Sequence, residues 1–371
     1  ANSAVLNRVL GSSLSRIDGS LFSNGRVYLI NPNGIVVGPT GRIDTAGFVA
    51  STLDLSDAQF MRGGALNFVG NSNASVVNLG TIQTVSGDVF LIARNVENHG
   101  TIYAPNGMVG LAAGQDVVLV EAGQERIAIR PAMSSSDTTG VLNAGTIQAA
   151  MAELKAHGNM YSLAINNTGL IRATGATTVG GRVILRADGG RVEHSGRIEA
   201  SQGDVGGEIQ ISGDIILLSG YALIDVSGAH GGGTVNLGGS FQGKGPLPNA
   251  SYTVVSPDAA IQADALEVGH GGTVIVWADR GTGFWGHVSA RGGVSGGDGG
   301  FVEVSGKEQL IFQGTVDTGA SAGQAGALLL DPKFLIVRIV GGVAYTGVNN
   351  LFADNAAGTN VLTPASIAAV V

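Results

Sequence analysis

Two stretches of the sequence match the Gly-x-Ser-x-Gly pattern of a serine nucleophile, at residues 293–297 and 319–323. A nucleophile elbow of this type needs a strand before the serine and a helix after it. Both stretches lie in glycine-rich segments without a helix signal, and a chain with 61 glycines produces such matches by chance. We therefore interpret both stretches as turns and expect no catalytic residue.

Two further patterns suggest ligand binding only at first sight. Residues 238–244 match the start of a phosphate loop, but Gly245 stands where Ser or Thr should bind magnesium, and prolines follow instead of a helix. Residues 296–300, GGDGG, are similar to a calcium-binding β-roll, but the nonapeptide of that fold is not repeated. We expect no cofactor and no bound metal.

The histidines and the aromatic residues also favour a structural interpretation. The six histidines form no H-x-x-x-H or H-E pair, so we interpret them as exposed turn residues: His99, His157, His194, His230, His270 and His287. Phe284, Trp277 and Trp285 cluster in sequence, and we expect them to pack against neighbouring strands rather than bind a sugar.

Three Asn-x-Ser/Thr sequons, at Asn73, Asn166 and Asn249, are the only modification signals that we single out. All three fall in segments expected to be turns or loops, where glycosylation is sterically possible. We carry them forward as possible glycosylation sites.

Composition excludes several classes of protein. A net charge of −8 and a charged fraction of 13% argue against binding to nucleic acid or to an anionic membrane. The chain has no cysteine, which excludes disulfides and thiolate metal sites. No signal peptide is evident from residue 1, and the apolar run 328–348 is interrupted by charged residues, so we expect no membrane span.

A first repeated phrase places an Asn-rich turn and a Gly before the sequence x-Ile-x-small. It occurs at residues 77–84, 96–104, 141–149, 165–173 and 192–200. Its isoleucines are Ile82, Ile102, Ile147, Ile171 and Ile198, and the residue two positions later is always small.

A second phrase alternates with the first and consists of a Gly pair followed by a short strand of period two. It begins at Gly180, Gly206, Gly232, Gly271 and Gly299, a spacing of about 26 residues apart from one longer step. Short strands joined by Gly and Asn corners at this period predict an all-β fold, a right-handed parallel β-helix built as a single-stranded solenoid with extra-helical loops. Like residues would then stack about 4.8 Å apart.

Three segments interrupt this rhythm. Residues 242–258 contain three of the nine prolines, and we interpret them as a loop inserted into one coil. Residues 122–140 are expected to form an irregular loop. Residues 151–165 are the only stretch in which we see any helical character, and there an irregular strand or loop remains the alternative to a short helix.

The most strongly specified corner is Asn31-Pro32-Asn33-Gly34, between the short strands VYLI and IVV. Proline presets φ for the second position of a turn, Asn can cap the turn with its side chain, and Asn and Gly tolerate positive φ. Taken alone, the corner is an ordinary turn.

The sequence around this corner resembles a known family. The segments NRV (7–9), IDGSL (17–21), LINPNGIVVGPTGRID (29–44) and GFVASTLDL (47–55) resemble the haemagglutination-activity domain of two-partner secretion exoproteins. The resemblance is strongest to the secretion domain of the high-molecular-weight adhesins, cousins of filamentous haemagglutinin. The later segments GGEIQISGD, GGTVIVWAD and LLLDP extend it over roughly residues 1–340.

The resemblance implies a secretion domain of a large adhesin on the surface of a Gram-negative bacterium. A dedicated outer-membrane β-barrel transporter would recognise it through periplasmic POTRA domains, and the β-helix would fold outside the cell. The implied secretion motif is Asn31, Pro32, Asn33, Gly34 and Ile35. A second Asn-rich motif of the family has only a weak counterpart here, at Asn71 and Asn73, because its Pro and Leu are missing.

The resemblance also implies an organisation of the chain and its partners. We expect a haemagglutination-activity part at 1–130 with a truncated amino-terminal cap, further coils at 131–340, and a tail or the start of the next region at 341–371. Any host-cell receptor or glycan would bind regions beyond this chain, and we expect a monomer without enzymatic activity.

Two alternatives remain open at this point. Contact-dependent toxins and haemolysins share the amino-terminal domain, although GGTVIVWAD and LLLDP favour the adhesin. Parallel β-helices also include polysaccharide lyases and hydrolases, which would need a cluster of Asp, Lys and Arg on one face. No such cluster is evident from the sequence.

Overall fold

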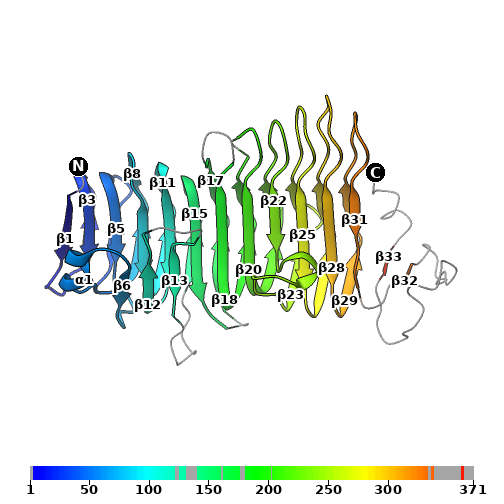
Figure 1. The fold of residues 1–371 in the computed structure, drawn as a ribbon. Coiled ribbons are helices and arrows are strands. Elements are labelled where there is room, and N and C mark those ends of the chain that lie inside the picture. The colour runs from blue at the N-terminus through cyan, green and yellow to red at the C-terminus, as the bar shows by residue number, and fades with distance from the viewer. Residues whose placement is uncertain are drawn as a thin grey trace. The chain divides into compact units, whose positions relative to one another are not determined.

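The computed structural model describes residues 3–121, 125–130, 140–159, 162–175, 180–201 and 203–332, and the backbone of 336–337 and 361–362. The chain divides into two compact units, residues 1–174 with 182–191, and residues 175–181 with 192–371. Strands make up almost all of the regular structure in both units (Figure 1).

The first unit is built from coils that each contribute strands to three parallel ladders. The first ladder contains β2 (Ser15–Ile17), β4 (Ile35–Val37), β7 (Ser75–Asn78), β10 (Asn95–Asn98), β14 (Gly140–Asn143) and β16 (Leu163–Asn167). The second contains the first residues of β3 (Ser20–Ile30) and β5 (Arg42–Ser51), β8 (Thr81–Thr84), the first residues of β11 (Thr101–Ala113) and β15 (Thr146–His157), and β17 (Leu170–Ala173). The third contains β1 (Ala4–Arg8), the later residues of β3 and β5, β9 (Val89–Ala93), the later residues of β11 and β15, and the first residues of β18 (Arg182–His194).

The repeated isoleucine of the first phrase forms an internal ladder in this unit. Ile82 pairs in register with Ile102, and Ile147 continues the column to Ile171. All of these side chains are fully buried, and each contributes about 1.5–3 kcal/mol relative to an exposed position. The small residues that follow them are buried as well, which lets the chain bend inside the stack.

The second unit has the same three-sided plan. One ladder contains β19 (Arg197–Glu199), β21 (Leu223–Asp225), β24 (Ala260–Gln262), β27 (His287–Ser289) and β30 (Thr315–Asp317). Another contains the first residues of β20 (Glu208–Leu218), then β22 (Thr234–Leu237), β25 (Thr273–Ala278), β28 (Phe301–Gly306) and β31 (Ala327–Leu329). The third contains the end of β20, β23 (Tyr252–Val255), β26 (Gly281–Phe284), β29 (Gln309–Phe312) and β33 (Val361–Leu362), which also pairs with β32 (Ile336–Val337). Both units are therefore right-handed parallel β-helices, and the predicted fold class is confirmed.

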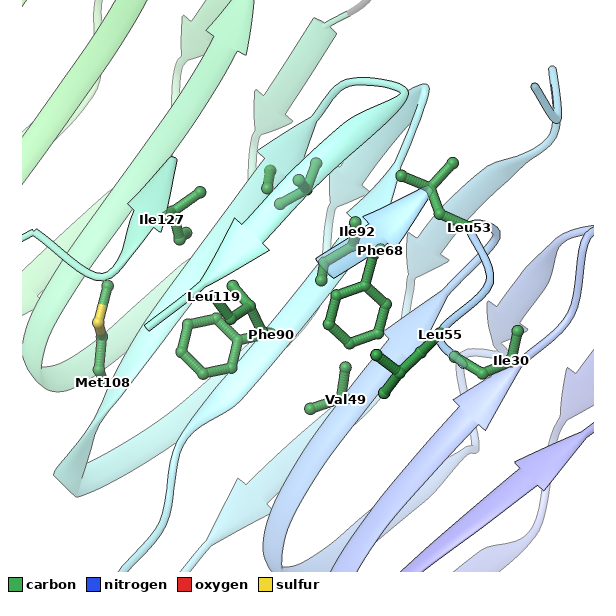
Figure 2. Packing of buried hydrophobic residues seen from close by; sticks show 12 residues of the cluster. Ile30, Val49, Leu53, Leu55, Phe68, Phe90, Ile92, Met108, Leu119 and Ile127 are labelled. Atoms are coloured by element: carbon green, nitrogen blue, oxygen red, sulfur yellow. The ribbon is translucent and has the colours of Figure 1, made fainter. Parts of the chain in front are cut away.

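An additional layer covers part of the outer face of the first unit. It consists of helix α1 (Asp57–Arg62) and a small antiparallel sheet of β6 (Leu66–Val69), β12 (Asp116–Leu119) and β13 (Ile127–Ile129). Figure 2 shows Phe68, Leu119 and Ile127 of this layer packed against outward side chains of the coil, such as Phe90 and Ile92. The face of the coil beneath this layer is apolar because the additional layer covers it.

For the described part of residues 151–165, the strand alternative is confirmed over a short helix, and helix α1 was not predicted. Residues 151–157 belong to β15 and residues 163–167 to β16. Helix α1 carries ordinary end signals, because the hydroxyl of Ser56 accepts a hydrogen bond from the Gln59 backbone N–H and Gly63 ends the helix at positive φ.

The inserted loop is shorter than predicted. Residues 252–255 form β23, a regular strand of the coil, and the excursion is confined to the residues before it, with the 3₁₀ turn η1 (Phe241–Gly243). Most of the predicted loop 122–140 and of the tail 341–371 lies outside the described residues.

Candidate recognition site

The Asn31–Gly34 corner joins β3 to β4 as a hydrogen-bonded turn. The Gly34 N–H donates to the Asn31 carbonyl at 3.0 Å, which closes the four-residue turn. Gly34 has φ +107°, and a side chain there would meet Leu14 Cδ1 at 3.1 Å and the Ser75 carbonyl at 3.3 Å. Backbone conformation and space both require glycine at this position.

The Asn31 side chain is fully buried and makes four hydrogen bonds. Its Nδ2 donates to the Ser13 carbonyl at 2.9 Å and to Ser15 Oγ at 2.8 Å. Its Oδ1 accepts from the Asn33 backbone N–H at 2.9 Å and from Asn33 Nδ2 at 3.0 Å. Asn31 therefore fixes its own turn and also ties it to the preceding coil.

The other motif residues divide between surface and core. Pro32 and Asn33 are exposed, and Asn33 Nδ2 also donates to the Gly11 carbonyl at 2.8 Å. Ile35 is fully buried and pairs in register with Ser15 on one side and with Val76 on the other. The corner thus presents a proline and an amide to solvent while its last residue anchors it in the core.

The structure brings the two predicted Asn-rich motifs together. Because β4 pairs with β7, residues 71–74 lie directly beside Asn31–Gly34 on the next coil. Ser72 Oγ donates to the Pro32 carbonyl at 2.6 Å and accepts from the Ala74 N–H at 3.1 Å. We call residues 11–15, 31–35 and 71–75 the three-coil corner. This link could not be predicted from the sequence, because Ser72 stands where the family motif has proline.

The three sequons differ in accessibility. Asn73 is exposed on the three-coil corner, although its Oδ1 accepts a hydrogen bond from Arg94. Asn166 lies half-buried within β16. Asn249 is half-buried, and its Nδ2 donates to the Gly243 carbonyl at 3.0 Å and to Asp279 Oδ1 at 3.2 Å. Of the three, Asn73 is the most accessible to modification.

The prediction that all six histidines are exposed turn residues was wrong for three of them. His157 is half-buried at the end of β15, and His287 is exposed but lies in the strand β27. His194 is fully buried, with its ring Nε2 3.2 Å from the Leu223 carbonyl, at the position that Asn98 occupies in an earlier copy of the repeat. Nowhere in the described part of the chain do three or more His, Asp or Glu side chains gather closely enough to hold a metal ion.

The aromatic residues of the later coils pack as expected. Phe284 stacks on Phe312 with ring centres 5.5 Å apart, and Trp277 is 5% exposed with its indole N–H donating to Asp279. The two Gly-x-Ser-x-Gly stretches lie in turns of the second unit, and the described residues after them form strands.

A column of buried asparagines is the polar feature that the sequence did not reveal. Asn78 Nδ2 donates to Asn98 Oδ1 at 2.8 Å, Asn98 Nδ2 to Asn143 Oδ1 at 2.8 Å, and Asn143 Nδ2 to Asn167 Oδ1 at 2.7 Å. The repeat predicts turns at these asparagines. The recurrence of Asn at one position of the repeat was the signal that could have indicated a stacked column. Each stacked amide provides hydrogen-bond partners for its neighbours, so the buried polar groups need no contact with solvent.

Two buried carboxylates hold segments outside the coil. Glu153 accepts from the Arg126 and Ile127 N–H groups at 2.8 and 3.0 Å and is fully buried. Glu303 accepts from the Gln242 N–H at 3.0 Å, which fixes η1 on the second unit. Burial raises the pKa of both carboxyl groups above the ordinary value of 4.5. Both carboxylates therefore anchor backbone N–H groups of segments outside the coil.

Comparison with known proteins decides the family. The family model described as the TPS secretion domain matches residues 1–211, more than half of the chain. The chain belongs to the TPS secretion domain family. Proteins with a TPS secretion domain leave the cell by two-partner secretion, with a dedicated transporter as partner, and reach the cell surface or the extracellular space.

Three proteins that are similar to this TPS secretion domain come from Haemophilus influenzae. The crystal structure of the HMW1 secretion domain is similar with a TM-score of 0.73 and 33% identity, over 89% of this chain and 86% of that one. A heme/hemopexin-binding protein of strain Rd is 31% identical over 206 residues, and a second protein of that name is 49% identical over 49 residues. These matches cover 51% and 13% of this chain, but only 22% and 5% of the two relatives, so this chain spans a small part of their length.

The family and the solved relative are secretion domains rather than enzymes. No helix formed by the described residues is long and apolar enough to span a bilayer.

Proposed function

We propose that this TPS secretion domain belongs to a large bacterial surface adhesin and that its transporter recognises the three-coil corner. The recognising part of the transporter would be its periplasmic POTRA domains. The domain would then cross the outer membrane of a Gram-negative cell unfolded and fold on the outside. Host receptors or glycans would bind parts of the adhesin beyond this chain.

One observation carries the proposal for the corner. Asn31 and Ser72 bind three separate coils into one hydrogen-bonded unit while Pro32 and Asn33 remain exposed. A recognition element needs an exposed face on a defined backbone, and the buried Asn31 amide supplies that definition.

The same bonds would help the coil to grow after export. A parallel β-helix can add one coil at a time, with each new coil templated by the last. The hydrogen bond from Ser72 to the Pro32 carbonyl joins two residues that are 40 positions apart and lie on neighbouring coils. An early contact of this kind fixes the register of the coils that follow.

The adhesin is preferred over the two alternatives. Identity of 33% to the HMW1 secretion domain extends over 89% of the chain, and the segments that resemble high-molecular-weight adhesins lie within it. The toxin and haemolysin interpretation depends on sequence that follows this chain. A lyase or hydrolase would need a catalytic cluster of acidic and basic side chains, which the family resemblance does not supply.

Binding to the transporter tests the corner directly. We would immobilise the periplasmic domains of the cognate transporter and measure binding of the chain and of the Asn33→Ala variant. Asn33→Ala removes an exposed amide, and we expect at least fivefold weaker binding, with Asn106→Ala, another exposed asparagine of the first unit, as the matched control. Equal binding of the two variants would exclude the corner as the recognised surface.

A further inference from the structure

A groove of about 580 Å³ opens on the outer face of the first unit, away from the three-coil corner. Its floor is the face formed by β3, β5 and β9, and its walls are the end of α1 with the following Gly63 and Gly64, and the end of β12. Its volume is typical of a small-molecule site. We call it the outer groove.

The outer groove continues the apolar layer beneath the additional sheet. Val49 and Phe90 of its floor are 5% and 4% exposed and lie beside Leu119, as Figure 2 shows. Tyr28 and Phe60 meet edge to face at its rim, with ring centres 5.2 Å apart. The half-buried Tyr28 and Phe60 therefore offer an incoming ring an aromatic edge above a closed apolar layer.

The acidic groups that line the groove are already bound. Asp88 accepts from Arg126 Nη1 at 2.7 Å and from the Met108 N–H at 2.9 Å. Glu121 accepts from the Gly64 N–H at 3.1 Å. The negative charges of the lining are therefore engaged within the protein.

The basic groups at the mouth are not engaged in the same way. Arg26 and Arg62 line the groove and are exposed, and the described part of the chain places no carboxylate in ion-pair contact with either guanidinium. Burial raises the pKa of the Tyr28 phenol above its ordinary value, while the charge of Arg26 lowers it in part. Arg26, Tyr28 and Arg62 thus line one groove, and both of its exposed arginines lack an ion-pair partner among the described residues.

We propose that the outer groove binds a small ligand that carries a carboxylate on an aromatic body. The carboxylate would lie between Arg26 and Arg62, since a guanidinium pairs with carboxylate through two parallel hydrogen bonds. The aromatic body would lie against the half-buried rings of Tyr28 and Phe60. This site is independent of the transporter and of the three-coil corner.

The wall of the groove is built to stay open. Gly63 and Gly64 have φ of +70° and +78°, a region that other residues adopt with strain. A side chain on Gly64 would meet nothing within 4 Å, so the connection from α1 to β6 leaves free space at the mouth.

The test is a calorimetric titration of the folded chain with indole-3-acetate and phenylacetate, and with their neutral amides as matched ligands. We expect the carboxylates to bind at least tenfold more tightly than the amides, because only they can use the guanidinium pair. The double variant Arg26→Ala/Arg62→Ala should weaken carboxylate binding at least tenfold and leave amide binding unchanged. Tyr28→Phe, which keeps the ring, should weaken it by a smaller factor.

Arg16→Ala is the control variant, because Arg16 is an exposed arginine of the first unit outside the groove and pairs with Asp18. Unchanged melting of each variant establishes that the fold is intact. Equal binding of carboxylates and amides, or wild-type binding by the double variant, would overturn the proposal. So would the absence of binding at millimolar ligand, or equally tight binding of a capped glutamyl peptide that has no aromatic group.

Discussion

Ser72 Oγ donates a hydrogen bond to the carbonyl oxygen of Pro32 at 2.6 Å and so joins two corners that the chain places on neighbouring coils. The contact gives the weaker of the two Asn-rich motifs a role that does not need its missing proline. The serine also accepts a hydrogen bond from the Ala74 N–H and thereby shapes its own turn.

Ser72→Ala should impair export more than it impairs stability. The variant loses two partly exposed hydrogen bonds, each worth about 0.5–1.5 kcal/mol, in a domain with a large core. We expect a melting temperature close to wild type and a measurable fall in the secreted fraction when the chain is expressed with its transporter. Ser20→Ala, an exposed serine of the first unit outside the three-coil corner, is the control and should be secreted normally. Normal secretion of Ser72→Ala would mean that the link between the corners is dispensable.

Asn98→Ala should be among the most destabilising polar substitutions in the first unit. Asn98 accepts from Asn78 and donates to Asn143, so its loss leaves a buried donor and a buried acceptor without partners. We expect a cost of about 2–4 kcal/mol in the free energy of unfolding, measured by urea denaturation. Asn106→Ala, which removes one exposed hydrogen bond to Val85, should cost less than about 1 kcal/mol. Similar costs for the two variants would show that the amide column adds little.

Glu303→Gln should change how stability depends on pH. Burial raises the pKa of Glu303, while the Gln242 N–H and Ser305 lower it in part and Asp331 adds to the rise. The folded chain therefore holds this proton more tightly than the unfolded chain does. The stability that this proton contributes is complete below pH 4.5 and is lost as the pH rises through the folded pKa.

Glutamine keeps an oxygen for the Gln242 N–H but cannot ionise. Relative to wild type, Glu303→Gln should therefore melt at a higher temperature at pH 8, and the difference should shrink as the pH falls toward 4. Melting curves over this pH range check the prediction, with the exposed Glu308→Gln as the control. A difference that does not change with pH would mean that folding does not raise the pKa of Glu303.

The repeat carried most of the information about the fold. The isoleucines of the first phrase lie on one ladder, and the strands of the Gly-pair phrase lie on another. In a β-helix, equivalent residues of successive coils stack on one another, so the repeat in the sequence has the same period as the coil. Helix α1 was missed because six residues are too few to display a helical period, although Ser56 and Gly63 marked its ends. Residues 151–157 were ambiguous because β15 is buried on both faces there, which removes the alternation typical of a strand.

The turn at the centre of the recognition site could be predicted from the sequence, but the residues that bind this turn could not. Turn chemistry alone located Asn31–Gly34, since Pro, Asn and Gly each have a defined role there. The partners Ser13, Ser15 and Ser72 were beyond the sequence, because their contacts depend on which residues the coil brings into register. The same reason explains why Glu303, which binds a backbone N–H 61 positions away, carried no recognisable signal.

The central claim is that Asn31 and Asn33 serve export rather than final stability. The test expresses the chain with a signal peptide beside its transporter, and compares the wild type with the Asn31→Ala/Asn33→Ala double variant. The variant should lose about 2–4 kcal/mol in the free energy of unfolding, as Asn98→Ala does, because both remove a fully buried, hydrogen-bonded amide. The account predicts that the variant accumulates in the periplasm, while the purified and refolded variant still unfolds cooperatively and Asn106→Ala is exported normally. Export of the double variant at the wild-type level would contradict it and leave Asn31–Gly34 an ordinary turn.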